Sequence, residues 1–317
     1  MPTASFIISA YNAEMFLRQT LDSCLSQTAP PDKILVADDG STDGTRQILE
    51  EYDHANPGIF ELTLLDKNQG RSNALNKLIE CLATDYALMI DADDIAFPTR
   101  LERQVAFMED NPDVGISSSF VKHIDSNGKH IGNGTMSPLT RNECTEILNS
   151  GDAIGFYCPA TIVRRSVFAD KTLWLRQSFF PADDIDLWNR VAERGIMIVG
   201  QAEFLTGYRI HSASASTSAF KYTRLKYEFV RASMAKRRMG HSEPSWDEFL
   251  KTWNERPWTQ KINAWRKDEA KARYRVAALN LAKKRHCRAM FAIMAAAALQ
   301  PSYVANRIKK QFKGFNR

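Results

Sequence analysis

The chain has 317 residues, of which 44% are hydrophobic and 25% are charged, a composition typical of proteins with a sizeable core. Five scattered cysteines without CxxC or metal-ligand spacing favour free thiols in a reducing compartment and argue against a disulfide framework. The first residues lack a basic segment followed by a long apolar core, and no stretch reaches the roughly 18 apolar residues of a membrane-spanning helix. We therefore expect a cytoplasmic protein.

The net charge of +5 conceals a strong asymmetry along the chain. Residues 221–317 contain 24 Lys and Arg against 7 Asp and Glu, whereas residues 1–220 contain 18 against 30. An asymmetry of this size indicates two parts with different partners.

The first third of the chain alternates apolar strands with helices. Strands are predicted at residues 5–9, 33–37, 60–65 and 86–90. Helices are predicted after Asn12, which can cap the first of them, near residues 44–52, and from Gly70 to residue 82. Alternation at this spacing predicts right-handed βαβ crossovers and an α/β fold with a mostly parallel sheet.

After residue 113 the pattern changes. A longer strand at 114–124 and a turn at Asn127-Gly128 predict a hairpin. Short elements follow, with helices at 140–149 and 184–193 and strands at 161–163, 196–199 and 206–210. Small residues at 212–218 suggest a domain boundary, and the rest reads as helix. We thus predict an α/β domain at 1–215, divided at 112/113, and a basic helical region at 216–317.

The stretch YALMIDADD at residues 86–94 is the most informative in the chain. An apolar strand ends abruptly in Asp91, Asp93 and Asp94. Ligands of open α/β sheets bind at the carboxyl ends of strands, and clustered carboxylates are ligands for hard divalent cations. Two interpretations stay open at this point: a metal-assisted site for a phosphorylated ligand, or an acidic turn before the next helix.

Eight short motifs stand in order between residues 7 and 211. They are IISAYN at 7–12, SQT at 26–28, VADDGSTD at 36–43, NQG at 68–70, DADD at 91–94, PAT at 159–161, DDIDLW at 183–188 and YRIH at 208–211. In this order they resemble glycosyltransferase family 2. The resemblance implies a GT-A fold and sugar transfer from a nucleotide donor with inversion. It also implies that residues 1–112 form the nucleotide-binding half and 113–215 the acceptor half.

The resemblance assigns the nucleotide-sugar site to the ends of the first four strands. Its residues would be Ala10, Tyr11, Asn12, Asp39, Arg71, Asp91 and Ala92. The turn at Ala10 can pack beside a planar base, and a carboxylate at Asp39 can accept a base N–H. The alternative for Asp39 is a purely structural role in its turn, and for Arg71 an exposed position in the first turn of a helix.

The resemblance also implies a divalent cation, Mn²⁺ or Mg²⁺. It makes Asp93 the direct ligand, places Asp91 on the ribose or beside the cation, and associates His211 with the metal or diphosphate. A cation can stabilise the charge that develops on the departing nucleoside diphosphate. The alternative for His211 is a hydrogen-bonded structural histidine, and Asp94 is expected to serve the turn.

Inverting transfer requires a base that takes a proton from the acceptor hydroxyl. Asp183-Asp184 matches the family's Glu-Asp pair, whose second member is the base, so we expect Asp184 to be catalytic and Asp183 to lie on the acceptor side with Thr161. The alternative is that the acids only favour the positive end of their helix. Cys158, where His is frequent in the family, is expected to line the pocket without acting as a nucleophile.

The basic tail has several candidate partners. No nucleic-acid-binding motif is present, and its aromatic residues are not interleaved as stacking platforms. Residues 290–299 are strongly apolar and are followed by cations at 307–313. This pattern favours a helix at an anionic membrane surface, and the family resemblance implies the inner face of the cytoplasmic membrane. The alternative is packing on the α/β domain or on a second subunit.

The sequence therefore predicts an inverting, metal-dependent glycosyltransferase. The expected donor is a UDP-sugar, and the expected acceptor is a hydroxyl of a glycan or lipid-linked molecule in bacterial surface polysaccharide synthesis. One alternative is a sugar-phosphate nucleotidyltransferase, but residues 9–16 have neither the glycine nor the cation of a triphosphate-binding loop. A non-catalytic sugar-binding or scaffold protein is the other.

Overall fold

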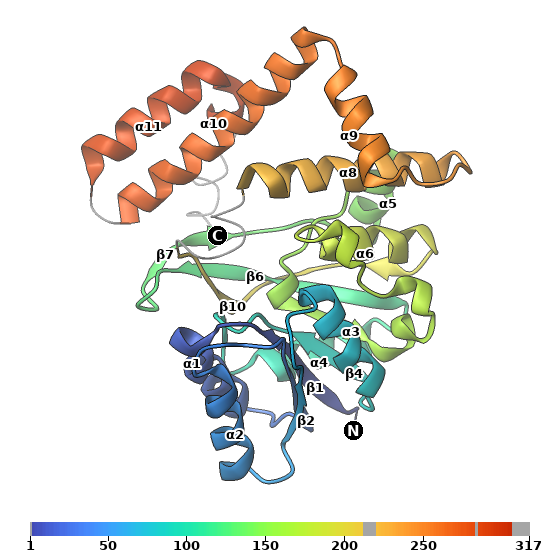
Figure 1. Cartoon of the computed structure of the whole chain (residues 1–317), viewed down its shortest axis with the longest axis vertical. Helices are drawn as coiled ribbons and strands as arrows, with labels where there is room; N and C mark the ends of the chain where they lie inside the picture. The colour runs from blue at the N-terminus through green and yellow to red at the C-terminus, as the bar shows by residue number, and fades with distance from the viewer. Residues whose placement is uncertain (1, 212–219, 283–284, 306–317) are drawn as a thin grey trace. The chain divides into compact units, whose positions relative to one another are not determined.

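The computed structural model describes residues 2–211, 220–282 and 285–305. Its first part is a parallel βαβ arrangement (Figure 1). The strands are β1 (Ala4–Ala10), β2 (Lys33–Asp38), β3 (Phe60–Leu64) and β4 (Tyr86–Met89). The helices are α1 (Glu14–Leu25), α2 (Thr45–Ala55) and α3 (Arg71–Cys81). β2 lies between β3 and β1, and β1 pairs with β4, as crossovers of one hand require.

The following strands extend the same sheet with mixed directions. They are β5 (Ile95–Ala96), β6 (Val114–Ile124), β7 (His130–Gly134), β8 (Thr161–Arg164), β9 (Met197–Ile198) and β10 (Gln201–Arg209). β8 is antiparallel to both β4 and β6, and β10 runs parallel to β6. β6 and β7 form the predicted hairpin. The sequence missed β5 because two residues carry no periodicity; its pairing with β10 defines it.

Helices and short 3-10 turns connect these strands. The helices of this part are α4 (Arg100–Asp110), α5 (Arg141–Asn149) and α6 (Asp183–Glu193). The 3-10 turns are η1 (Cys158–Ala160), η2 (Arg165–Ala169), η3 (Lys171–Leu173) and η4 (Gln177–Phe179).

The sheet is buried on both faces. Side chains of β1 alternate: Phe6 and Ile8 pack in one hydrophobic cluster, and Ile7 packs in the other. Burial on both sides explains why the strands read as continuous apolar runs, the pattern of a parallel sheet between helix layers. The predicted mostly parallel α/β sheet is therefore confirmed.

The chain divides into two compact units, residues 1–214 with 226–243 and residues 215–225 with 244–317. The predicted boundary segment 212–218 lies outside the described residues, and the domain limits stay a prediction. Most of α8 (Phe220–Arg238) belongs to the first unit. Phe229 stacks on Phe179 at 4.6 Å, and Lys226 donates to the Ser178 carbonyl at 2.6 Å. These contacts explain why this basic helix folds with the α/β unit.

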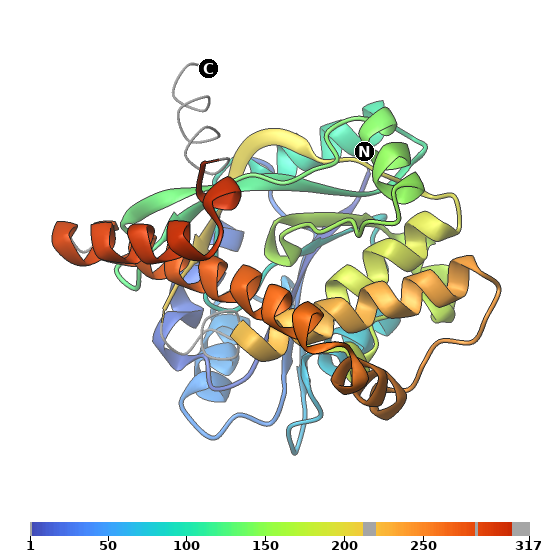
Figure 2. The same cartoon turned by 90° about the horizontal axis from the view of Figure 1, so that it is seen from above.

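The second unit is helical. It contains α9 (Trp246–Glu255), α10 (Trp258–Ala282) and α11 (His286–Leu299). Ser245 and Glu248 form a capping box that starts α9. α10 and α11 lie side by side (Figures 1 and 2), with small residues such as Ala289 and Ala296 buried. None of the described helices combines the length and apolar character needed to cross a membrane.

Packing of Phe229 within the first unit predicts a clear stability effect. Phe229 is 3% exposed, so Phe229→Ala should lower the free energy of unfolding by about 3 kcal/mol through lost burial and a cavity. Tyr222→Ala, at a ring 46% exposed on the same helix, is the matched control. Thermal denaturation followed by circular dichroism measures both, and equal melting temperatures for the two variants would contradict this packing.

Candidate functional site

Three carboxylates crowd together where β4 ends. Oxygen atoms of Asp91, Asp93 and Asp94 all lie within 4.8 Å of one another. Asp94 is 1% exposed and accepts a 2.7 Å hydrogen bond from the Arg209 backbone N–H. Burial, Asp93 and Asp91 raise the pKa of the Asp94 carboxyl well above its ordinary value. The cluster therefore concentrates negative charge that a cation would relieve.

The donor set suits a hard divalent cation. Oδ2 of Asp94 is buried and has no hydrogen-bond partner among the described residues, so the cluster holds an unused oxygen. Asp93 approaches His211 with 2.8 Å between Oδ2 and Nε2, and the His211 ring lies 5.0 Å from the Phe16 ring. Carboxylate oxygens with one imidazole are ligands that Mn²⁺ accepts and Mg²⁺ accepts less readily. The sequence placed Asp93 and His211 together, and the structure brings them into contact.

Arg71 lies between this cluster and a second pair of acids. Its Nη2 donates to Asp91 at 2.8 Å and lies 3.1 Å from the sulfur of Cys158, while Nη1 lies 3.4 Å from Asp183. The side chain leaves the first turn of α3 and is mostly buried. The interpretation of Arg71 as an exposed helix residue is therefore wrong.

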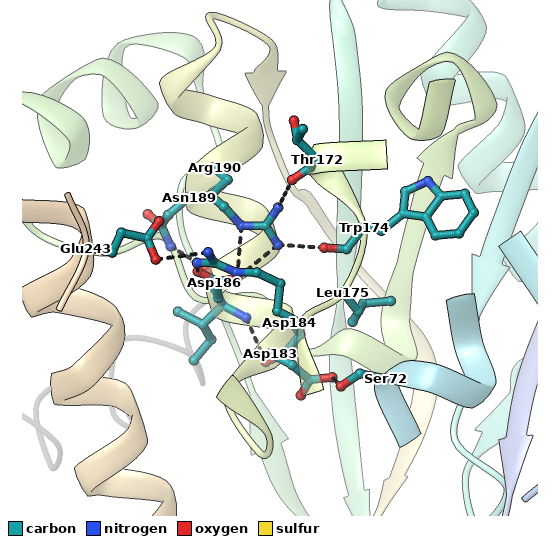
Figure 3. A network of polar contacts seen from close by, with 12 residues as sticks. Ser72, Thr172, Trp174, Leu175, Asp183, Asp184, Asp186, Asn189, Arg190 and Glu243 are labelled. Atoms are coloured by element: carbon teal, nitrogen blue, oxygen red, sulfur yellow. Dashed lines mark hydrogen bonds and ion pairs between the residues drawn. The ribbon is translucent and has the colours of Figure 1, made fainter. Parts of the chain in front are cut away.

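The two neighbouring acids at the start of α6 have different environments (Figure 3). Asp183 is 1% exposed and accepts a 2.7 Å hydrogen bond from the Ser72 hydroxyl. Burial and the charge of Asp183 raise the pKa of Asp184 to about 7, against the opposing effect of Arg71. Asp183 is thus committed to internal partners, whereas Asp184 can exchange a proton near neutral pH.

Asp39 is held by the backbone of the α3 entry. The side chain is 1% exposed, and its two oxygens accept hydrogen bonds from the backbone N–H groups of Gln69 (2.7 Å) and Gly70 (2.9 Å). These bonds supply the structural role that the sequence left as an alternative. Each carboxylate oxygen keeps a second lone pair, and contact with a base stays a prediction.

The turn predicted to bind the base differs from the sequence prediction in the role of Asn12. Asn12 does not cap α1: it has a left-handed φ of 48°, and its Oδ1 accepts from the Thr42 backbone N–H at 2.8 Å. The residue at the N-cap is Ala13, and the Glu14 N–H donates to Asp43 instead. The ring of Tyr11 is 49% exposed at this turn.

Three other predicted residues are buried. Ala10 is inaccessible and Ala92 nearly so, which leaves backbone groups as their means of contact. Thr161 is also inaccessible, and its hydroxyl donates to the Tyr157 carbonyl at 2.9 Å, so this placement does not support direct contact with an acceptor. Burial raises the pKa of the Cys158 thiol far above its ordinary value, which agrees with a non-nucleophilic cysteine.

Sequence reasoning missed the residues that join the two halves of the site. Gln177 accepts from the Ser72 backbone N–H at 3.0 Å, and Asn76 donates to the Leu175 carbonyl at 2.8 Å. Gly70 has a φ of +92°, which favours glycine, and a Cβ at this position would lie 2.3 Å from the Gln177 amide nitrogen and displace that side chain. Gly70 of the NQG motif was the one signal in the sequence for this contact. No local pattern identifies Gln177.

Comparison with known proteins identifies the family of this chain. Residues 5–171 match the family model described as Glycosyl transferase family 2. An uncharacterized glycosyltransferase of Haemophilus influenzae is 30% identical over 227 residues, covering 68% of each chain. The amylovoran biosynthesis glycosyltransferase AmsE of Erwinia amylovora is 25% identical over 240 residues, covering 74% of this chain and 87% of AmsE.

Two solved structures have the same fold. The mannosyltransferase PcManGT from Pyrobaculum calidifontis, in complex with GDP-Man and Mn²⁺, aligns with a TM-score of 0.56 at 17% identity, over 99% of this chain and 83% of PcManGT. S. aureus TarS 1–349, in complex with UDP-GlcNAc, aligns with a TM-score of 0.55 at 17% identity, over 96% and 92%. These matches confirm the predicted GT-A fold. The chain therefore belongs to glycosyltransferase family 2, whose enzymes transfer sugar from nucleotide-sugar donors.

Proposed function

We propose that this protein is an inverting, divalent-cation-dependent glycosyltransferase that uses a UDP-sugar. One observation carries the proposal: Arg71 connects the carboxylate cluster after β4 to the acidic pair that opens α6. A cluster suited to a cation and its diphosphate thus lies across Arg71 from an acidic pair that contains Asp184, the acid suited to proton transfer. UDP-GlcNAc bound to TarS and GDP-Man with Mn²⁺ bound to PcManGT support a nucleotide-sugar donor with a cation.

Asp184 acts as the base in this proposal. Transfer with inversion is one in-line displacement, in which the acceptor hydroxyl attacks the anomeric carbon as the C–O bond to the diphosphate breaks. Asp184 takes the hydroxyl proton. With a pKa of about 7, a substantial fraction of Asp184 is ionised at neutral pH. The ionised carboxylate is also more basic than an ordinary aspartate, so it accepts the proton more readily.

The donor is held by the ends of the first four strands. Asp93 and His211, with Asp91 beside them, would hold Mn²⁺ or Mg²⁺, whose charge would stabilise the nucleoside diphosphate leaving group. Tyr11 offers an exposed ring to the base, and Asp39 secures the α3 entry from which Arg71 reaches the site. Arg71 supplies a fixed positive charge between donor and acceptor sides.

We propose a bacterial surface glycan or its lipid-linked precursor as the acceptor. Support comes from AmsE, whose name assigns it to amylovoran biosynthesis. The second unit favours a peripheral position at an anionic membrane. On α10, Trp258, Ile262 and Trp265 are exposed at helical spacing; on α11, Met290, Phe291 and Met294 are exposed. Exposed apolar side chains on a cationic unit suit such a surface.

Asp93→Ala should abolish the cation-dependent reaction. Loss of a ligand that helps neutralise the leaving group should reduce the rate of UDP release from a UDP-sugar by about 100-fold or more. The rate is measured for a panel of UDP-sugars with Mn²⁺ and with EDTA. Asp53→Ala, at an exposed position on α2, is the matched control. Unchanged UDP release from the Asp93→Ala protein would contradict the mechanism.

Asp184→Asn should abolish transfer and change the pH dependence of stability. The Asp184 carboxyl ionises near pH 3.8 in the unfolded chain and near pH 7 in the folded protein. The contribution of its protonated form to the free energy of unfolding is therefore fully present below pH 3.8 and is lost as the pH rises through about 7. The Asn variant avoids this loss, and its melting temperature in EDTA should exceed the wild-type value by about 3 °C at pH 8. At pH 4 the two should be nearly equal.

The control for this experiment is a carboxyl whose pKa is shifted in the opposite direction. Arg141 lowers the pKa of Asp113 through a direct hydrogen bond, so Asp113→Asn should not raise the melting temperature at pH 8. The same difference between wild type and Asp184→Asn at pH 4 and pH 8 would refute the raised pKa.

Membrane association is tested by vesicle flotation. Wild-type protein should float with vesicles containing phosphatidylglycerol and remain unbound with phosphatidylcholine. Serine at Met290, Phe291 and Met294 should remove this binding by deleting exposed apolar contacts. Serine at Met15 and Met239, which are 78% and 71% exposed elsewhere, is the control. Equal flotation of both variants would contradict the membrane proposal.

A further inference from the structure

A cavity lined by arginines lies in the first unit, beside the C-terminal half of α6. Its volume is about 450 Å³, within the range of small-ligand sites. The proposed reaction does not use it. η3, α6 and the end of α8 contribute to its walls, which contain five arginines: Arg176, Arg190, Arg194, Arg237 and Arg238.

Two of these arginines have a structural role. Asp186 is fully buried and accepts hydrogen bonds from Arg176 at 2.9 and 2.5 Å and from Arg190 at 2.9 Å. Arg190 also donates to the carbonyls of Thr172 and Trp174 (Figure 3). A buried carboxylate needs this compensation, so Arg176 and Arg190 are committed to the fold.

The other three arginines are less fully compensated. Arg237 donates to Glu193 at 2.6 Å and Glu243 at 2.8 Å, but its buried Nη2 has no partner among the described residues. The side chain of Arg194 is 58% exposed, pairs at 3.1 Å with the exposed acid Asp170, and donates to the Thr172 hydroxyl at 3.1 Å. Arg238 lies 3.4 Å from Glu193 and donates to the Leu148 carbonyl at 2.9 Å, so each outer arginine keeps only part of its donors for a ligand.

The charges around the cavity do not balance. Its five arginines pair with four carboxylates, those of Asp170, Asp186, Glu193 and Glu243. Each arginine has an acid partner, but the five arginines and four carboxylates sum to one net positive charge, and Nη2 of Arg237 is a buried donor without a partner among the described residues. Arginine forks match the oxygens of phosphate and carboxylate groups, and such charge-assisted hydrogen bonds are the stronger ones in proteins.

The cavity and the acidic pair lie near opposite ends of α6, and Asp183, but not Asp184, shares the side of the helix that leads to the cavity. Asp183, Asp186, Arg190 and Glu193 follow one another at spacings of three or four residues, which places them on the same side of the helix. Ten residues separate Asp184 from Arg194, a rise of about 15 Å. A group bound among the outer arginines would thus lie a few sugar units from a hydroxyl at Asp184.

We infer that this cavity binds an oxyanion, a phosphate or a carboxylate, carried by the acceptor glycan. The acceptor is then an acidic polymer, and the cavity holds one of its charged groups while a hydroxyl nearer the base reacts. Identification of the ligand as an acceptor rests on the proposed function; binding of an oxyanion does not.

Isothermal titration of the full-length protein in EDTA tests the inference. The two probes are inorganic pyrophosphate and an oligogalacturonate, which separate a phosphate site from a carboxylate site. Replacing Arg194 and Arg238 together by Gln should weaken binding of the preferred probe by about tenfold or more. The matched control replaces Arg103 and Arg141 by Gln, because these exposed arginines also form ion pairs with acids. The control should bind as wild type.

Two results would overturn the inference: no binding of either probe to the wild-type protein, or equal binding by both double variants. Release of UDP from a UDP-sugar by the wild-type protein is measured separately. Loss of probe binding in the Arg194/Arg238 variant without any such release would retain the oxyanion site and reject the proposed donor reaction.

Discussion

The site depends on the ion pairs of Arg71. Parallel strands and two helices bring five aspartates to one edge of the sheet, and like charges at this density oppose folding. Arg71 contacts Asp91 of the cluster and Asp183 of the acidic pair, so one guanidinium lowers the repulsion on both sides. Its planar fork can serve two carboxylates at once, which a lysine ammonium at the same position would do less well.

The position of Arg71 is set by contacts at the start of α3. Asp39 accepts from the Gln69 and Gly70 backbone N–H groups, and Gln177 accepts from that of Ser72. These bonds satisfy donors that a helix start leaves without intrahelical partners. They also join β2 of the donor side to η4 of the acceptor side. The same contacts therefore complete the helix and align the two halves of the site.

Neighbouring aspartates acquire different chemistry from their surroundings. Asp183 and Asp186 are inaccessible and are each bound by hydroxyl or guanidinium donors. Asp184, between them in sequence, lies on another side of α6 and has a raised pKa. The periodicity of the helix thus separates one acid that can exchange protons from two that anchor the helix. Asp186 in turn orients arginines of the arginine-lined cavity, which connects packing of α6 with the inferred binding of an acidic acceptor.

Much of this could be predicted from the sequence. Apolar runs of β-branched residues determine the parallel strands, because a strand buried on both faces needs no alternation. Ordered motifs identified the family, and they pointed to the carboxylate cluster and the acidic pair, since these residues lie at strand and helix ends. Tertiary structure alone decided that Arg71 bridges the two acidic groups, that Asn12 binds Thr42 and does not cap α1, and that Arg176 and Arg190 neutralise Asp186. Apart from the Asp186–Arg190 pair, which has i,i+4 spacing on α6, these contacts join residues 10 to 112 positions apart, and no local pattern specifies them. They follow from which chain segments the sheet brings together.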